Sequence, residues 1–202
     1  MYKIAAFIKF NKLIENKVLL QKKKVKKKFG NQMYLDHPVH LTLFTINIKK
    51  ISALKEIYNK IKTKSKKKNI KLNINLAGVF MNDPLTKGHT LFYGVKKSSL
   101  LSLAQIKHLK MINNKIYVSK KDFKKINNPL LKKNYFKYGF LFAGKIWLPH
   151  ITIASIKDVN QDHFFIKNFL KRRVNFKSIA ENIEFYRVSN NKHYFLFKTN
   201  LI

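Results

Sequence analysis

Residues 38–44 read PVHLTLF, and residues 148–154 read LPHITIA. The two segments are near copies of each other, and each has a histidine two positions before a threonine inside an apolar run. Side chains two residues apart on an extended strand point to the same face. The sequence therefore predicts two strands that each present one imidazole and one hydroxyl side by side.

Chance does not readily explain two such copies. Seven histidines and seven threonines in 202 residues give about 0.24 His-x-Thr triplets in a random chain. Two copies, each with apolar residues at the middle and following positions, are expected in about one random chain in a thousand. A single copy would indicate an ordinary strand with a half-buried histidine, whereas the matched pair indicates a site.

Alternation along the first segment places Leu41 and Leu43 on one face and His40, Thr42 and Phe44 on the other. We expect the apolar face to pack on helices and the other face to line a cleft, where Phe44 would contact substrate. The second segment repeats the pattern with His150 and Thr152.

These residue types suit the cleavage of a phosphodiester without a metal ion. Such a reaction needs a base to deprotonate water and an acid to protonate the departing oxygen, and both must lie in line across the phosphorus. Imidazole, with an unperturbed pKa of about 6.5, can take either role at neutral pH. The hydroxyls of Thr42 and Thr152 would donate hydrogen bonds to the non-bridging oxygens, where charge accumulates.

The two His-x-Thr motifs, about a hundred residues apart, resemble those of the two-histidine (2H) phosphoesterase superfamily. Its LigT-like members include RNA 2′,3′-cyclic phosphodiesterases, also called 2′-5′ RNA ligases. The resemblance implies two pseudo-symmetric lobes around a central cleft, each lobe a mostly antiparallel sheet with helices on its outer face. It also implies that His40 is the proton donor and His150 the acceptor, although the residues themselves do not distinguish the order.

Two further features bear on this resemblance. LigT-like proteins often carry a pair like Tyr186-Arg187 on a strand near the C-terminus, so both residues are candidate substrate contacts, and a surface salt bridge is the alternative for Arg187. An arginine commonly follows each motif in the bacterial LigT pattern, whereas Phe44-Thr45 and Ala154-Ser155 stand here. This departure affects the choice of substrate more than the class of reaction.

Hydrophobic periodicity predicts an α+β fold with mostly antiparallel pairing, formed by one domain over residues 1–202. The segment MYKIAAFIKF at residues 1–10 fits a first strand better than a leader peptide. The expected strands are 2–10, 39–48, 70–81, 89–96, 139–155, 183–188 and 193–199, and the expected helices are 12–29, 51–61, 98–111 and 160–172.

Composition indicates a folded protein with an anionic partner. The net charge is +34, from 43 basic and 9 acidic residues, and 46% of the residues are hydrophobic. A field this positive attracts nucleic acid and also anionic membranes, but no apolar stretch approaches the roughly 20 residues of a membrane span. The absence of cysteine is compatible with a cytoplasmic protein. We expect a monomer with no cofactor and no metal site.

Residues 117–140 interleave aromatic residues with lysines, and Tyr135 and Tyr138 are candidate substrate contacts there. Such a stretch can bind single-stranded nucleic acid through stacked bases and lysine–phosphate contacts. Equally, its aromatic side chains can fill the core.

Three functions remain open at this point. The first is a phosphodiesterase acting on a 2′,3′-cyclic phosphate, or a related 2′,5′ linkage, in RNA or a nucleotide. The second is a non-catalytic RNA-binding protein that uses the basic cleft of the same fold. The third is a cyclic phosphodiesterase for a small metabolite.

Overall fold

The computed structural model describes residues 1–64, 69–190 and 192–201. Among these residues the strands are β1 (Tyr2–Ile8), β2 (Leu41–Ile48), β3 (Ile70–Asp83), β4 (Gly88–Val95), β5 (His150–Ile156), β6 (Phe176–Ala180), β7 (Asn182–Ser189) and β8 (Lys192–Asn200). The helices are α1 (Lys12–Phe29), α2 (Ala53–Lys64), α3 (Ser99–Ile112), α4 (Lys120–Lys124), α5 (Pro129–Tyr138) and α6 (Phe164–Leu170).

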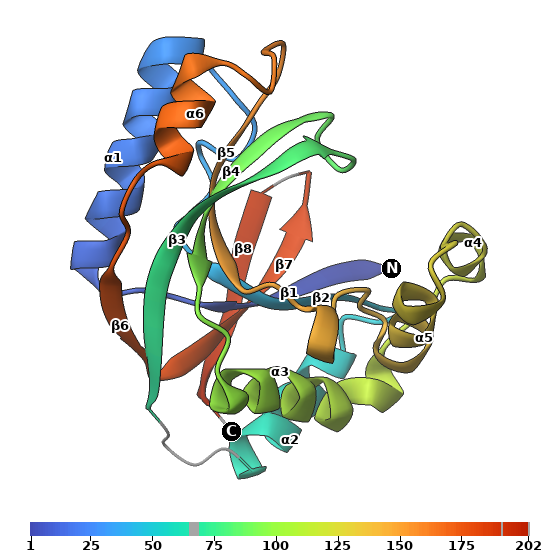
Figure 1. The fold of residues 1–202 in the computed structure, drawn as a ribbon. Helices are drawn as coiled ribbons and strands as arrows, with labels where there is room; N and C mark the ends of the chain where they lie inside the picture. The colour runs from blue at the N-terminus through green and yellow to red at the C-terminus, as the bar shows by residue number, and fades with distance from the viewer. Residues whose placement is uncertain (65–68, 191, 202) are drawn as a thin grey trace.

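The strands form a single antiparallel sheet in the order β6-β3-β4-β5-β2-β1-β7-β8. At its centre β2 and β5 are paired through only one residue pair, Leu41 with Ile151. The sheet therefore divides into two halves of four strands each, and the two motif strands are the innermost strand of each half (Figure 1). The predicted α+β fold with two lobes is confirmed.

The helices tie the two halves together. Helix α1 connects β1 to β2 but packs on β5, in the opposite half. Helix α3 connects β4 to β5 but packs on β2. Each β-α-β unit thus covers part of the outer face of the other half, so its apolar residues are buried only when both halves are folded.

The sheet also curls back on itself. Strands β6 and β7 belong to opposite halves, yet only Glu181 separates them in the chain. The lower left of Figure 1 shows β6 running directly into β7. This closure brings the outer strands of the two halves together on one side of the molecule.

The core that fixes the motif strands contains Leu41, Leu43, Ile151 and Ile153, all with no exposed surface. They are the apolar residues of the two motifs, as the alternation predicts. Their burial leaves the intervening polar side chains on the opposite, concave face.

A β-bulge follows each motif at the same position. Phe7 is paired with Thr42 while Ala6 is paired with Phe44, so Leu43 is an extra residue in β2. In the second half Ile153 is the extra residue in β5, because Phe92 is paired with Thr152 and Leu91 with Ala154. A bulge reverses the alternation of faces and increases local twist.

The first bulge overturns the interpretation of Phe44. Its side chain has no exposed surface and lies against Phe185, with 6.1 Å between ring centroids. It therefore faces the core and cannot contact a ligand in the cleft. The prediction was wrong because strict alternation does not continue through the extra residue Leu43.

Four parts of the chain differ from the sequence expectation. Residues 139–149 precede β5 as turns and a short 3₁₀ helix rather than as strand. Helices α4 and α5 and strand β6 were not predicted. The signals for α5 were present, because Asn128 caps it, Pro129 begins it and Gly139 ends it with φ +60°.

A buried glutamine holds the first bulge. The side-chain amide of Gln105 in α3 donates to the carbonyl oxygens of Leu43 and Phe142, at 2.7 and 3.3 Å, and accepts from the amide of Gly144 at 2.9 Å. Gln105 has no exposed surface.

We therefore expect Gln105→Leu to lower the free energy of unfolding by about 2 kcal/mol, because one buried and two partly buried backbone groups lose their partner. Urea denaturation at unchanged m-value measures this loss. The exposed residue Gln161 provides the matched control, and Gln161→Leu should change stability by less than about 0.5 kcal/mol. Equal effects of the two substitutions would contradict the role of Gln105.

Candidate active site

The register of the central pair brings the two motifs together. Because Leu41 lies opposite Ile151 in an antiparallel arrangement, His40 comes opposite Thr152, and Thr42 opposite His150. Leu41 and Ile151 point into the core, so their immediate neighbours point to the other face. The four predicted residues are only partly buried there. His40 and His150 are therefore diagonal neighbours. In a regular antiparallel pair the backbones of such neighbours are about 7–8 Å apart.

The two imidazoles are held by equivalent hydrogen bonds, each from Nδ1 to the carbonyl oxygen two residues earlier. Nδ1 of His40 lies 2.6 Å from the carbonyl oxygen of Pro38, and Nδ1 of His150 lies 2.7 Å from that of Leu148. A carbonyl oxygen only accepts, so Nδ1 carries the proton in both rings. In the neutral ring Nε2 then has the lone pair, which is the state required of a base; a second proton at Nε2 makes the ring an acid.

The His40 ring lies in a cluster of aromatic side chains. It stacks on Phe7 of β1 with 3.8 Å between centroids, and the ring of His193 of β8 lies 5.7 Å away. Tyr186 of β7 lies 5.2 Å from Phe7, and its hydroxyl donates to Glu184 at 2.5 Å. Side chains of β1 and β8 thus lie against the His40 ring, and Tyr186 of β7 packs on Phe7.

The His150 ring lies against a second aromatic pair. Phe80 of β3 and Phe92 of β4 stack on each other and have centroids 5.1 and 5.3 Å from that of His150. Gly78 is required beneath them, because a Cβ there would collide with the ring of Phe92. Each imidazole therefore has aromatic side chains on its flanks and a threonine across the strand pair.

The electrostatic surroundings of the two rings differ. The pKa of His40 is lowered to about 3, mainly by burial; the Pro38 carbonyl opposes this, and electrostatic interaction with His193, Lys9 and His37 contributes to the lowering. Burial also lowers the pKa of His150, but the Leu148 carbonyl and the carboxylate of Asp83 raise it. Both rings are therefore neutral at pH 7 in the free protein, and the field favours the first proton at His150.

The carboxylate of Asp83 belongs to a buried network at the tip of the β3–β4 hairpin. It accepts a hydrogen bond from the Thr90 hydroxyl at 2.7 Å. Beside it the hydroxyl of Ser155 in β5 donates to that of Thr86 at 2.6 Å. The network fixes the hairpin against the strand that carries His150.

A buried lysine fixes the loop before His40. The ammonium of Lys22 in α1 donates to the carbonyl oxygens of Tyr34, Leu35 and His37 within 3.2 Å. Burial lowers the pKa of Lys22 to about 8, with an opposing effect from Asp36. The loop continues through Pro38, whose carbonyl orients the His40 ring.

The remaining predicted contacts have mixed outcomes. Tyr186 lies next to the Phe7–His40 stack, whereas the Arg187 guanidinium lies over Tyr194 at 5.0 Å. Tyr135 and Tyr138 of α5 are buried, and the Tyr135 hydroxyl accepts from the amide of Ser119. Their prediction as substrate contacts was wrong, because the helix that was not predicted turns both rings into the interior.

Sequence reasoning missed Phe7 and His193 and gave His37 little weight. The centroid of the His193 ring lies 4.7 Å from that of His37 and 5.2 Å from that of Phe7. All three meet His40 only because the curled sheet and the 31–38 loop converge. The one local signal for His193 was that it shares a face of an edge strand with Phe195, two residues later.

The described residues offer neither a metal site nor a membrane span. No three His, Cys, Asp or Glu side chains there are grouped so that they could hold a metal ion. No helix in that part of the chain is both long and apolar enough to cross a membrane.

Known proteins share this fold at low sequence identity. Escherichia coli LigT in its apo form is 12% identical with a TM-score of 0.60, and the alignment covers 99% of this chain and 97% of LigT. TT0787 of Thermus thermophilus is 13% identical with a TM-score of 0.64, covering 98% and 97%. No protein-family model and no curated protein sequence matches the chain. The LigT-like fold that the motifs predicted is confirmed.

The Lys22 contact predicts a local effect. We expect Lys22→Met to accelerate hydrogen exchange at the amides of Leu35 and His37 by about tenfold to a hundredfold, because a charged donor to three carbonyls is lost. The exposed neighbour Lys23 gives the control Lys23→Met, which should leave the loop unchanged. Unchanged exchange in Lys22→Met would show that other contacts hold the loop.

The lowered pKa values predict a pH-dependent affinity for anions. An anion between the rings favours the imidazolium form, so binding to the neutral site takes up a proton. Affinity for sulfate, which stays a dianion, should rise by up to about tenfold per pH unit as the pH falls from about 8 to 5.5.

Calorimetry in two buffers of different ionisation enthalpy counts the protons taken up. The uptake should disappear in the His40→Asn/His150→Asn double variant. Sulfate binding without proton uptake in the unchanged protein would contradict the lowered pKa values.

Proposed function

We propose that this protein is a metal-independent phosphodiesterase that hydrolyses 2′,3′-cyclic phosphates, or related 2′,5′ linkages, of RNA or nucleotides. One observation carries the proposal. Two imidazoles, each fixed through Nδ1 by the carbonyl two residues earlier, flank the one residue pair, Leu41 with Ile151, through which the two motif strands are joined. This arrangement leaves two Nε2 atoms and two hydroxyls for one phosphate.

In the proposed reaction His150 deprotonates a water molecule as its oxygen bonds to phosphorus. The bond from phosphorus to one ribose oxygen breaks, and His40 protonates that oxygen. The product is a phosphomonoester; His150 has gained the proton of the water and His40 has given one up, so the pair must exchange a proton before the next turnover. The order of the two roles follows the 2H resemblance, and Thr42 and Thr152 donate to the non-bridging oxygens.

This order requires the bound substrate to change the protonation of the site. In the free protein the first proton favours His150, next to Asp83, over His40. The negative charge of a bound phosphate raises the pKa of His40, so His40 becomes protonated when the substrate binds. Activity should therefore decline as the pH rises above neutrality, because the imidazolium form becomes scarce.

Charge and fold support a nucleotide or RNA substrate. The net charge of +34 attracts polyanions. Among the similar structures, E. coli LigT has been solved in complexes with 3′-AMP and with ATP. The 3′-AMP complex has a TM-score of 0.55 to this chain and is 14% identical.

The histidine substitutions test the proposal. Each acid or base role is worth about 10²–10⁴ in rate, so His40→Ala and His150→Ala should each lower kcat for a nucleoside 2′,3′-cyclic phosphate by at least about a hundredfold. Turnover by the unchanged protein should persist with a chelator present. His163, which caps α6, gives the control His163→Asn with unchanged turnover. Retained activity in either site variant would refute the assignment.

A second substrate separates the two roles. A phosphodiester with an activated aryl leaving group needs no proton donor, so it should restore turnover in the variant that lacks the acid and not in the variant that lacks the base. The proposed order predicts recovery in His40→Ala alone. Recovery in His150→Ala alone would reverse the roles, and recovery in neither would reject acid catalysis by this pair.

A further inference from the structure

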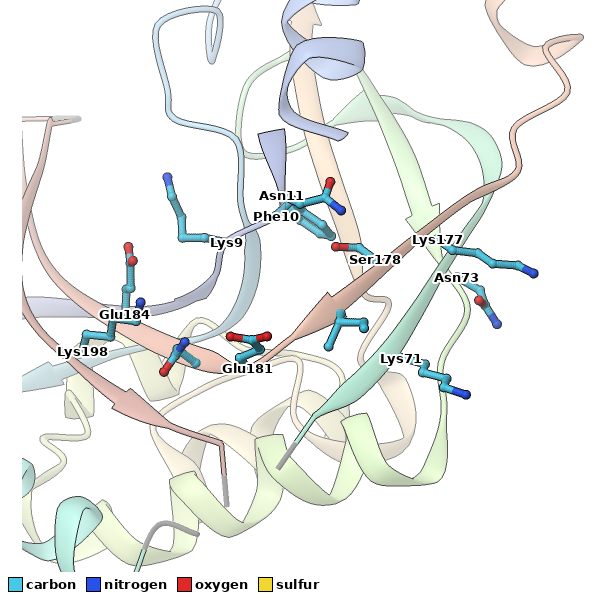
Figure 2. A pocket seen from close by; sticks show the side chains of 12 residues that line it. Lys9, Phe10, Asn11, Lys71, Asn73, Lys177, Ser178, Glu181, Glu184 and Lys198 are labelled. Carbon is cyan, nitrogen blue, oxygen red and sulfur yellow. The ribbon is translucent and has the colours of Figure 1, made fainter. Parts of the chain in front are cut away.

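A cavity of about 910 Å³ lies where the two halves of the sheet close on each other. Its walls come from the end of β1, from β3 and β6, and from β7 and β8, as Figure 2 shows. This volume is within the range of ligand-binding pockets. None of the residues predicted from the sequence as site residues lines it.

The cavity adjoins the His40 side of the candidate active site. Lys9 on its wall follows Phe7 by two residues, and its charge lowers the pKa of His40. Glu184, also on the wall, is paired with Phe7 in the sheet and accepts from Tyr186. Lys9 and Glu184 therefore place the cavity beside Phe7, the residue that stacks on His40.

Four lysines line the cavity: Lys9, Lys71, Lys177 and Lys198. The ion pairs of the described residues include none of them. Against them stand Glu181 and Glu184, so the lining carries a net charge of +2, four minus two. Figure 2 shows Lys71 and Lys177 reaching to one side of the cavity and Lys9 and Lys198 lying on the other, so each side offers two ammonium groups suited to a phosphate.

The neutral groups of the wall are mainly hydrogen-bonding groups. They include Asn11, Asn73 and Asn182. The hydroxyl of Ser178 is unusual, because its residue is only 5% exposed and its Oγ has no hydrogen-bond partner. Ser178 lies on the buried face of β6, opposite to Lys177, so the three asparagines are the uncharged polar side chains available to a ligand.

We propose that this cavity is a second phosphate site, which holds the phosphate on the 5′ side of the nucleotide whose cyclic phosphate reacts between His40 and His150. The inference rests on the proposed function and deepens it. The shared chemistry is a second phosphate, which either a 5′-phosphate on a mononucleotide or the backbone of an RNA strand supplies. The protein would then distinguish substrates with this phosphate from nucleosides without it.

The test uses binding of unreactive ligands, so that it does not depend on turnover. Adenosine 3′,5′-bisphosphate should bind at least about tenfold more tightly than adenosine 3′-phosphate, because the second phosphate gains charge-assisted hydrogen bonds. The triple variant Lys71→Gln/Lys177→Gln/Lys198→Gln should lose this advantage. Calorimetry at fixed salt measures both ligands.

The control removes the same charge elsewhere. Lys24, Lys27 and Lys28 are exposed on α1 and do not line the cavity, so changing all three to Gln should preserve the tenfold advantage. Equal affinities for the two ligands in the unchanged protein would overturn the second site. An advantage that survives in the cavity variant, or disappears in the α1 variant, would assign it to the general positive field.

Two further arms complete the test. If a trinucleotide ending in a 3′-phosphate binds more tightly than the bisphosphate, the strand is the source of the second phosphate; equal affinity identifies the 5′-phosphate alone. If no cyclic phosphate is hydrolysed but the bisphosphate keeps its advantage, the proposed function fails and the phosphate site stands.

Discussion

The pairing of Leu41 with Ile151 is the constraint on which the candidate site depends. It is the single residue pair that joins the two halves of the sheet at their centre in the described part of the chain, and both side chains are fully buried. An antiparallel register centred on the middle residue of each motif sets each histidine opposite the other motif's threonine. A shift of one residue would turn one motif's polar pair into the core. The bulges at Leu43 and Ile153 support this register. Helices α1 and α3 also support it, because each packs on the opposite half of the sheet.

The two halves place their histidines symmetrically but not in the same field. Both Nδ1 atoms contact a carbonyl two residues earlier. His40 then meets Lys9 and the other histidines, while Asp83 acts on His150. Acid–base catalysis needs one protonated and one neutral ring. The field of the free protein favours the first proton at His150, so the proposed order depends on the bound phosphate to protonate His40. Lys9 acts on His40 and also lines the cavity, so the proposed second phosphate site has one cation in common with the surroundings of His40.

The features that depend on local sequence pattern could be predicted from the sequence. Period-two alternation around His40 and His150 predicted which side chains share a face, and helical spacing predicted α1 at its observed bounds. Prediction failed where the pattern breaks or where distant segments meet. The bulge at Leu43 turned Phe44 inward, and α5 buried Tyr135. His193 reaches His40 only through the curl of the sheet, and the cavity needs β6 and β7 to close. Strand pairing sets these features, and no short stretch of sequence encodes them.

The most direct test of the central claim is a crystal structure of the protein with a bound nucleoside 3′-phosphate. The account predicts one phosphate with Nε2 of His40 and Nε2 of His150 each about 2.6–3.2 Å from its oxygens, and with the hydroxyls of Thr42 and Thr152 facing it. A phosphate that contacts only one of the two imidazoles, or that binds away from both, would contradict it.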